Sequence, residues 1–193
     1  MGAQVHGTQH FDQKKREQIK FSEAAMAEVK EILNHYPAER KKSALLPVLH
    51  IAQAEFGGWL SPETMDYVAE VLQIKPIEVF EVASFYTMFN LKPVGKVTFE
   101  VCQTSSCWLC GAEDIIKHFE KKLNIKAGET TKDGMFTLKT AECLGSCGTA
   151  PMLQCGASFH ENLTYDKVDK LIEKYRSEAR LRSYTDRDYE NTL

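Results

Sequence analysis

Apolar residues recur at steps of three and four in the first half of the chain, as on one face of a helix. Ser61-Pro62-Glu63 combines a capping hydroxyl, a proline at the first helical position and an acid in the first turn, and so predicts a helix start. We therefore predict a helical domain over residues 18–92. The spacing is shown by two sets of residues: Met26, Val29, Leu33 and Tyr36, and then Leu45, Leu49, Ala52 and Phe56.

The rhythm changes after Pro93-Val94-Gly95, where apolar and polar residues begin to alternate, as in a strand with one buried face. The order β-α-β-β-α predicts an α+β fold class, with a sheet domain over residues 93–176, a flexible arm at 1–17 and a charged tail at 177–193. The expected elements are a strand with Val97, Phe99 and Val101 that leads into Cys102, a helix with Ile116, Phe119 and Leu123, a strand with Phe136 and Leu138 that ends at Cys143, a strand pair around 152–153 and 158–160, and a helix capped by Thr164.

Composition narrows the function classes. The 193 residues carry a net charge of −3, which gives no electrostatic case for nucleic acid or for acidic membranes. No run approaches the ~18 apolar residues of a membrane span. The first 20 residues contain one Arg, two acids and no apolar stretch, so neither a secretory nor a transit peptide is indicated. We expect a soluble protein of a reducing compartment.

Six cysteines lie in the second half of the chain, and two pairs among them follow predicted strands. Cys102 and Cys107 are separated by four residues, and Cys143 and Cys147 by three. Small or polar neighbours, such as Gly145-Ser146 and Gly148-Thr149, let the backbone approach and aim N–H groups at sulfur. Two such pairs fit a binuclear [2Fe–2S] cluster.

Other types of site remain open at this point. Cys107 and Cys110 have the spacing of a zinc knuckle and of a thioredoxin dithiol. Cys102, Cys107 and Cys110 also match the opening of plant-type ferredoxins, which would make Cys110 a ligand and either Cys143 or Cys147 spare. A Rieske-like site needs two His ligands, and the six histidines do not cluster. Unless they are ligands, Cys110 and Cys155 are predicted to be small buried side chains.

Several stretches, in order over about residues 20–175, resemble the 24-kDa-type subunit of respiratory complex I, the E subunit of bacterial NADH–quinone oxidoreductase. Related subunits occur in NAD-linked hydrogenases and formate dehydrogenases. The matching stretches are Tyr36-Pro37 with Arg40, Leu46-Pro47-Val48-Leu49-His50-Ile51-Ala52-Gln53, Gly58-Trp59-Leu60-Ser61, Val82-Ala83-Ser84-Phe85-Tyr86-Thr87-Met88-Phe89, Val101-Cys102 to Cys107, and Glu142-Cys143-Leu144-Gly145-Ser146-Cys147 through Ala150-Pro151.

This resemblance implies an N-terminal helical domain followed by a thioredoxin-like [2Fe–2S] ferredoxin domain. It places the ligands at Cys102, Cys107, Cys143 and Cys147, and none at Cys110 or Cys155. It implies docking against a flavoprotein subunit that carries FMN and the NADH site, beside further iron–sulfur subunits. The location implied is cytoplasmic and peripheral at the inner membrane, without direct insertion.

The chain has no Gly-rich strand–helix fingerprint for a dinucleotide, so we expect NADH to bind to the partner. No nucleophile–base arrangement suggests independent catalysis. The expected function is single-electron exchange with the partner's FMN. The alternatives are the equivalent subunit of a hydrogenase or formate dehydrogenase, and a free-standing thioredoxin-like ferredoxin. The aromatic-rich run 85–89 fits either a core or a contact surface.

Overall fold

The computed structural model describes residues 19–178 of the chain. The predicted arm at 1–17 and residues 179–193 of the predicted tail lie outside the described residues. The described chain divides into two compact units, one formed by residues 19–56 and 60–91 and the other by residues 57–59 and 92–178. Each unit has its own buried core.

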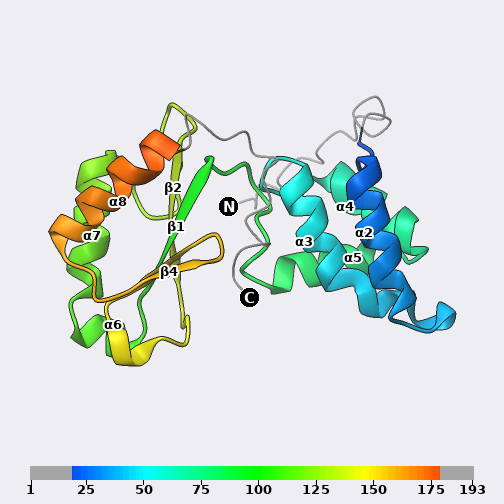
Figure 1. The fold of residues 1–193 in the computed structure, drawn as a ribbon, viewed down its shortest axis with the longest axis horizontal. Helices are drawn as coiled ribbons and strands as arrows, with labels where there is room; N and C mark the ends of the chain where they lie inside the picture. The colour runs from blue at the N-terminus through cyan, green and yellow to red at the C-terminus, as the bar shows by residue number, and fades with distance from the viewer. Residues whose placement is uncertain (1–18, 179–193) are drawn as a thin grey trace, which may run out of the picture. The chain divides into compact units, whose positions relative to one another are not determined.

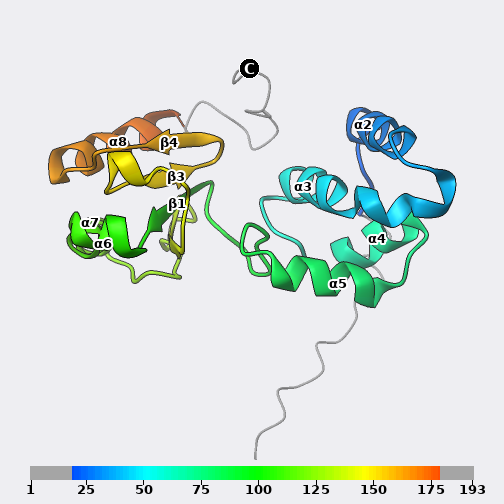
Figure 2. The same ribbon diagram turned by 90° about the horizontal axis from the view of Figure 1, so that it is seen from below.

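The first unit consists of helices that pack against one another (Figure 2). In chain order they are α2 (Glu23–Asn34), the 3₁₀ segment η1 (Ala38–Ala44), α3 (Leu45–Glu55), α4 (Pro62–Leu72) and α5 (Pro76–Phe85). The Ser61 Oγ accepts a hydrogen bond from the Thr64 N–H at 3.1 Å, which confirms the predicted helix start. The apolar faces of α2, α3 and α4 meet in a core whose fully buried side chains include Val29, Val48, Leu49, Val68 and Leu72.

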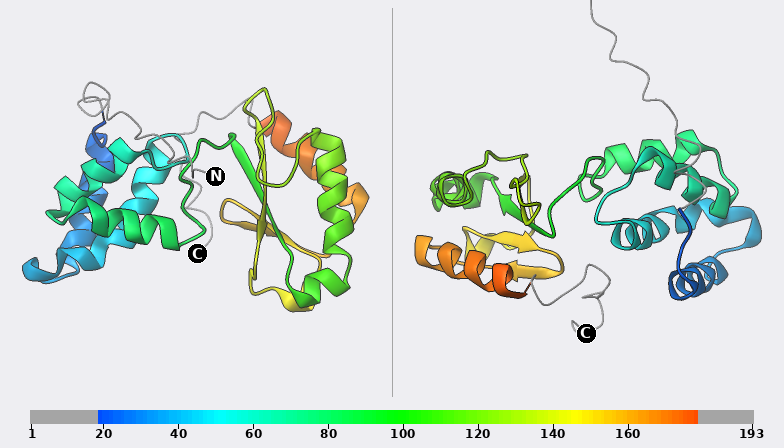
Figure 3. Two further views of the ribbon diagram at one scale, coloured as in Figure 1. Left: turned by 180° about the vertical axis from the view of Figure 1, so that it is seen from behind. Right: turned by 90° about the horizontal axis from the view of Figure 1, so that it is seen from above.

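The second unit contains a four-stranded sheet in the order β2-β1-β3-β4. Strand β1 (Val97–Cys102) pairs parallel with β2 (Phe136–Ala141), and β3 (Leu153–Cys155) pairs antiparallel with β1 and with β4 (Ser158–His160). The hairpin of β3 and β4 leads into helix α8 (Tyr165–Glu178) (Figure 3). All four predicted strands are present, although β2 ends at Ala141, two residues before its predicted end at Cys143.

Helices α7 (Ala112–Leu123) and α8 (Tyr165–Glu178) lie side by side against one face of this sheet (Figure 1). Phe99, in the middle of β1, is fully buried beneath them. Its ring centroid lies 5.0 Å from that of Phe119 on α7, 5.6 Å from Phe136 on β2 and 5.7 Å from Tyr175 on α8. The fold is therefore α+β, with N-terminal helices followed by a sheet covered by helices, as predicted.

Local differences from the sequence prediction occur in short segments. Neither η1 nor the five-residue helix α6 (Ser105–Leu109) is predicted, because so few residues do not show a helical period. On α7 the buried position is Ile115, whereas Ile116 is only partly buried. Thr164 accepts a hydrogen bond from the Lys167 N–H at 3.3 Å and so caps α8 as predicted. None of the helices within residues 19–178 has the length and apolar character that a bilayer crossing requires.

Candidate metal centre

The two predicted cysteine pairs follow the parallel strands β1 and β2. Cys102 is the last residue of β1, and Cys143 follows the end of β2 by two residues. Because the strands are parallel, their carboxyl ends meet at one edge of the sheet, where Cys102 lies opposite Ala141. Both cysteine loops therefore leave the sheet from the same edge.

The first loop turns from β1 into α6 and brings Cys107 next to Cys102. The two thiols are joined by a hydrogen bond, and their residues are only 2% and 1% exposed. The Cys102 Sγ also lies 3.3 Å from Thr104 Oγ1 and donates to the Glu142 carbonyl oxygen at 3.3 Å. Cys102 thus contacts both its own loop and the residue directly before Cys143.

Met152 contacts both buried cysteines through its backbone. Its carbonyl accepts the Cys102 N–H at 3.1 Å, and its own N–H donates to the Cys107 sulfur. The Leu144 N–H similarly donates to the Cys102 sulfur. The fully buried Met152 side chain packs with Cys102, Cys107 and Ala112 in a small apolar cluster. The two sulfurs are therefore surrounded by apolar side chains and by directed backbone donors.

The second loop carries Cys143 and Cys147 and is more exposed. Gly145 has a φ of +82°, a left-handed conformation that glycine adopts without strain. The chain then turns into a short 3₁₀ segment, η2 (Cys147–Thr149). Cys147 lies close enough to Cys107 to interact with it electrostatically. The structure therefore brings Cys102 and Cys107 together, while Cys143 and Cys147 are exposed on the second loop and Cys147 lies within electrostatic range of Cys107.

The surroundings shift the pKa values of the two buried thiols, Cys102 and Cys107, in opposite directions. Burial, followed by the hydrogen bond with Cys102, raises the pKa of Cys107 to about 11. Burial also acts to raise the pKa of Cys102, but hydrogen bonds from the Thr104 side chain and backbone, from Cys107 and from the Leu144 N–H outweigh it and lower that pKa below its ordinary value. Cys102 is therefore the first of this pair to become a thiolate.

The donor set fits an iron–sulfur cluster. A [2Fe–2S] cluster takes thiolate ligands and is stabilised by N–H···S hydrogen bonds and burial, and Leu144 and Met152 supply such donors here. Among residues 19–178, no three His, Cys, Asp or Glu side chains converge as ligands of a single metal ion. A binuclear cluster shares four thiolates between two irons, which matches two pairs of cysteines.

The remaining two cysteines occupy different surroundings. Cys110 follows α6 and is exposed, which contradicts the prediction that it is buried. Cys155 is buried at the end of β3 in the core of the sheet unit, as predicted.

Comparison with known proteins identifies the family. The pattern of the family described as thioredoxin-like [2Fe–2S] ferredoxin matches residues 29–176, which include parts of both units. The chain belongs to this family.

Individual relatives of this ferredoxin extend the similarity over most of the chain. The E subunit of NADH-quinone oxidoreductase from Rickettsia conorii is 49% identical over 148 residues, covering 77% of this chain and 89% of the relative. The protein of the same name from Rickettsia prowazekii is 50% identical over 147 residues, with 76% and 83% covered. The resemblance to the E-subunit family seen in the sequence is thereby confirmed.

A solved structure supports the fold. An NAD⁺-reducing [NiFe]-hydrogenase in the air-oxidised state superposes with a TM-score of 0.61 at 21% identity. The match covers 70% of this ferredoxin but only 23% of the hydrogenase chain. At this identity, the likeness concerns the fold alone.

Several groups at the candidate centre of this ferredoxin are not identified by reasoning from the sequence. Met152 resembles an ordinary core residue in sequence, and its role as a donor appears only through the pairing of β3 with β1. Glu161 contacts the second cysteine loop, where its carboxylate accepts a hydrogen bond from Thr149 Oγ1 at 2.6 Å. The only sequence signal for Glu161 is its place just after a predicted strand.

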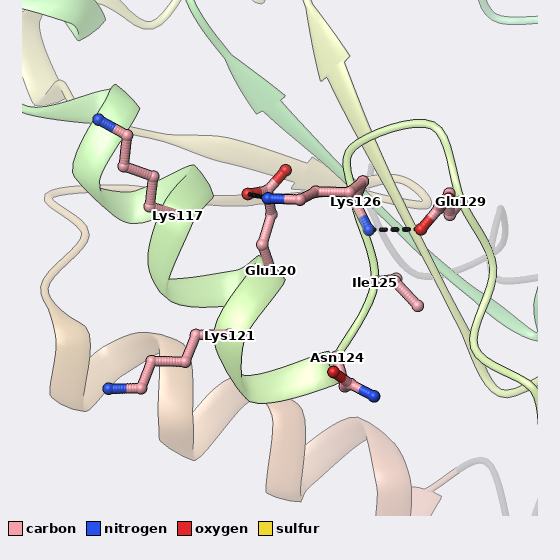
Figure 4. A pocket seen from close by; sticks show the side chains of 7 residues that line it. All are labelled: Lys117, Glu120, Lys121, Asn124, Ile125, Lys126 and Glu129. Atoms are coloured by element: carbon pink, nitrogen blue, oxygen red, sulfur yellow. Dashed lines mark hydrogen bonds and ion pairs between the residues drawn. The ribbon is translucent and has the colours of Figure 1, made fainter.

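A concavity of about 470 Å³ lies elsewhere in the ferredoxin unit, beside the C-terminal half of α7 (Figure 4). Lys126 pairs with Glu120 at 2.9 Å there, and its backbone N–H donates to Glu129 at 2.6 Å. Its lining contains no cysteine, so it is separate from the candidate centre: Lys117, Glu120, Lys121, Asn124, Ile125, Lys126 and Glu129.

Proposed function

We propose that this chain is the electron-transfer subunit of an NADH:quinone oxidoreductase and holds one [2Fe–2S] cluster on Cys102, Cys107, Cys143 and Cys147. The observation that carries the proposal is the meeting of two cysteine loops at one sheet edge, where backbone N–H groups donate to the sulfurs. Similarity to the E-subunit relatives over 77% of the chain supports the assignment.

When bound, the cluster supplies reversible one-electron chemistry. The chain contributes thiolates, N–H donors and a partly dry enclosure, which together set the reduction potential. Cys102 and Cys107 lie on the buried side with Met152, whereas Cys143 and Cys147 lie on the exposed side. The exposed pair therefore marks the side from which an electron donor approaches most closely.

The electron partner in this proposal is the FMN of a flavoprotein subunit that also binds NADH. Further iron–sulfur subunits complete a peripheral arm on the cytoplasmic side of the inner membrane. Residues 93–176 form the cluster domain and residues 18–92 the docking domain. The isolated chain does not oxidise NADH, and measurable NADH oxidation by the flavin-free chain would refute this division of roles.

An exposed apolar surface in the helical unit supports a docking role. Phe85 is 78% exposed at the end of α5, and Ile77 and Phe80 are 57% and 48% exposed on the same helix. Tyr86, Met88 and Leu91 extend this apolar surface along the following segment. Exposed aromatic side chains gathered in this way are typical of protein interfaces.

The segment that follows α5 is held firmly by α3. The Gln53 amide donates to the Met88 carbonyl at 3.0 Å and accepts the Asn90 N–H at 2.7 Å. The Phe89 ring is buried, with its centroid 5.0 Å from that of His50. A partner would therefore meet a preorganised surface, which lowers the entropy cost of binding.

A second exposed apolar pair follows Cys107 directly. Trp108 and Leu109 on α6 are 59% and 76% exposed. We propose that they contact the flavoprotein beside the cluster, since a covered edge excludes water from the path of the electron.

The alternative assignment is the equivalent subunit of an NAD-linked hydrogenase or formate dehydrogenase. The likeness to the hydrogenase structure concerns the fold alone and does not favour this alternative.

The test is anaerobic purification followed by reduction with dithionite, EPR spectroscopy, and iron and sulfide analysis. We expect an S = 1/2 signal and about two irons and two sulfides per chain. Cys147→Ala should lose this signal and Cys110→Ala should retain it. Loss of the signal in Cys110→Ala would favour the plant-type ligand set. A colourless, iron-free wild-type chain that binds zinc or reduces disulfides would overturn the proposal.

A further inference from the structure

A single carboxylate contacts the turn that carries Cys147. Glu161 follows β4 directly, and its Oε1 accepts hydrogen bonds from Ser146 Oγ and from Thr149 Oγ1, the latter at 2.6 Å. Ser146 and Thr149 stand on either side of Cys147 in the sequence. The Glu161 carboxylate therefore bridges the two ends of the Cys147 turn.

The hydroxyl groups provide only two protons for this network. Ser146 Oγ and Thr149 Oγ1 lie 2.7 Å apart, and Thr149 Oγ1 is also 3.2 Å from the Ser146 carbonyl. Hydrogen bonds to an ionised carboxylate are roughly twice as strong as neutral ones, so both protons are directed to Glu161. The hydrogen bonds from Ser146 and then Thr149 lower the pKa of Glu161, which keeps it ionised at neutral pH.

The two residues after Glu161 brace the same loop through the backbone. The Asn162 N–H donates to the Thr149 carbonyl at 2.7 Å, and the Leu163 N–H donates to the Pro151 carbonyl at 2.8 Å. Leu163 is 5% exposed and belongs to the core of the sheet unit. Residues 161–163 thus connect the exposed Cys147 turn to the rigid part of the unit.

We propose that Glu161 is a positioning residue for the iron–sulfur cluster, which it serves by fixing the Cys147 turn and by adding one negative charge beside it. This inference rests on the proposed function. The charge opposes the arrival of an electron, because the potential of a cluster falls as negative charge accumulates around it. The fixed turn slows the release of Cys147 from the cluster, since the ligand cannot swing away unless these hydrogen bonds break.

Two substitutions separate these effects in the full-length chain. Glu161→Gln keeps an oxygen that can accept a hydrogen bond and removes the charge, while Glu161→Ala removes both. Glu173→Gln removes an exposed charge from α8 and serves as the matched control. Each protein is purified anaerobically, and its midpoint potential, EPR spectrum and rate of iron loss to a chelator are measured. Amide hydrogen exchange of residues 146–150 is followed in the same samples.

We expect Glu161→Gln to retain full iron content and to have a more positive midpoint potential than the wild type. Glu161→Ala should show this positive shift, an altered EPR spectrum and at least about tenfold faster loss of iron, because it loses two charge-assisted hydrogen bonds and each corresponds to about tenfold or more. Amide exchange over 146–150 should rise in Glu161→Ala. The Glu173→Gln control should match the wild type in every measurement.

A wild-type potential in both Glu161 variants, together with unchanged iron loss and unchanged amide exchange, would overturn the inference. The proposed function fails by a different result, namely a wild-type chain that contains no iron. In that case the exchange data still decide whether Glu161 fixes the turn, because the hydrogen bonds of Ser146 and Thr149 are present in the chain without a cluster.

Discussion

Cys102, at the end of β1, and Met152, directly before the antiparallel strand β3, are joined by a hydrogen bond in which the Cys102 N–H donates to the Met152 carbonyl at 3.1 Å. The Met152 N–H donates in turn to the sulfur of Cys107. The single residue Met152 therefore connects the end of β1 to the first turn of α6. Any change at Met152 is expected to affect both buried cysteines.

Met152→Ala should destabilise the chain by about 2–5 kcal/mol, the usual cost of removing a large buried side chain. The Met152 side chain is fully buried in the apolar cluster that it forms with Cys102, Cys107 and Ala112, so the substitution leaves a cavity beside the two cysteines. Denaturant unfolding of the cluster-free protein measures the effect. Met88→Ala, at a position 38% exposed, is the control and should cost far less. Equal losses in the two variants would contradict the packing described here.

Gly95→Ala should also destabilise the chain, by about 1–3 kcal/mol. A Cβ at Gly95 would lie 2.8 Å from the carbonyl carbon of Phe136 and 2.9 Å from that of Met135, and neither backbone atom can move without shifting β2. Gly148→Ala is the matched control, because a Cβ there meets nothing within 4 Å. Thermal unfolding of both variants should show a lower midpoint for Gly95→Ala only, and an undisturbed Gly95→Ala protein would refute the close approach.

Periodicity predicts most of the elements but not how they come together. Alternation identifies β1, and the apolar pair Phe136 and Leu138 identifies β2, yet nothing in either strand specifies their parallel pairing or the register that places Cys102 opposite Ala141. That register is set by contacts between segments far apart in the chain. It decides whether the two cysteine loops meet.

The candidate site shows the same limit. Cysteine spacing and adjacent small residues indicate a cluster site, whereas Met152 and Glu161 contribute through atoms that any residue with a backbone or a carboxylate could offer. Helix α6 is missed because five residues are too few to show a period, and its formation is what brings Cys107 back to Cys102. Amino-acid composition indicates neither the contacts of Met152 and Glu161 nor the formation of α6.

The raised pKa of Cys107 predicts a pH-dependent stability in the cluster-free chain. Burial, followed by the hydrogen bond with Cys102, raises this pKa from 9.0 to about 11. The folded state therefore keeps a proton that the unfolded state releases above pH 9. This contribution to stability is fully present below pH 9 and is lost as the pH rises through about 11.

Denaturant unfolding between pH 8.5 and 11 tests this expectation. The free energy of unfolding should fall over this window by on the order of 2 kcal/mol more in the wild type than in Cys107→Ala. The comparison of slopes removes the cost of the cavity that the substitution creates, and it removes the titration of groups that do not contact Cys107. Parallel pH profiles would show that Cys107 titrates alike in the folded and unfolded chains.

The exposed surface of α5 gives a prediction about assembly. Phe85→Ser should weaken binding to the co-expressed flavoprotein subunit by about tenfold or more, since exposed aromatic residues dominate the affinity of protein interfaces. Phe85 is 78% exposed and outside the core of its own unit, so the stability and iron content of the variant should equal those of the wild type.

Phe159→Ser removes a ring that is 47% exposed on β4 and is the matched control. Titration calorimetry with the purified flavoprotein measures both affinities. If the Phe159 variant binds more weakly and the Phe85 variant binds normally, the docking surface lies on the sheet unit and α5 does not form it.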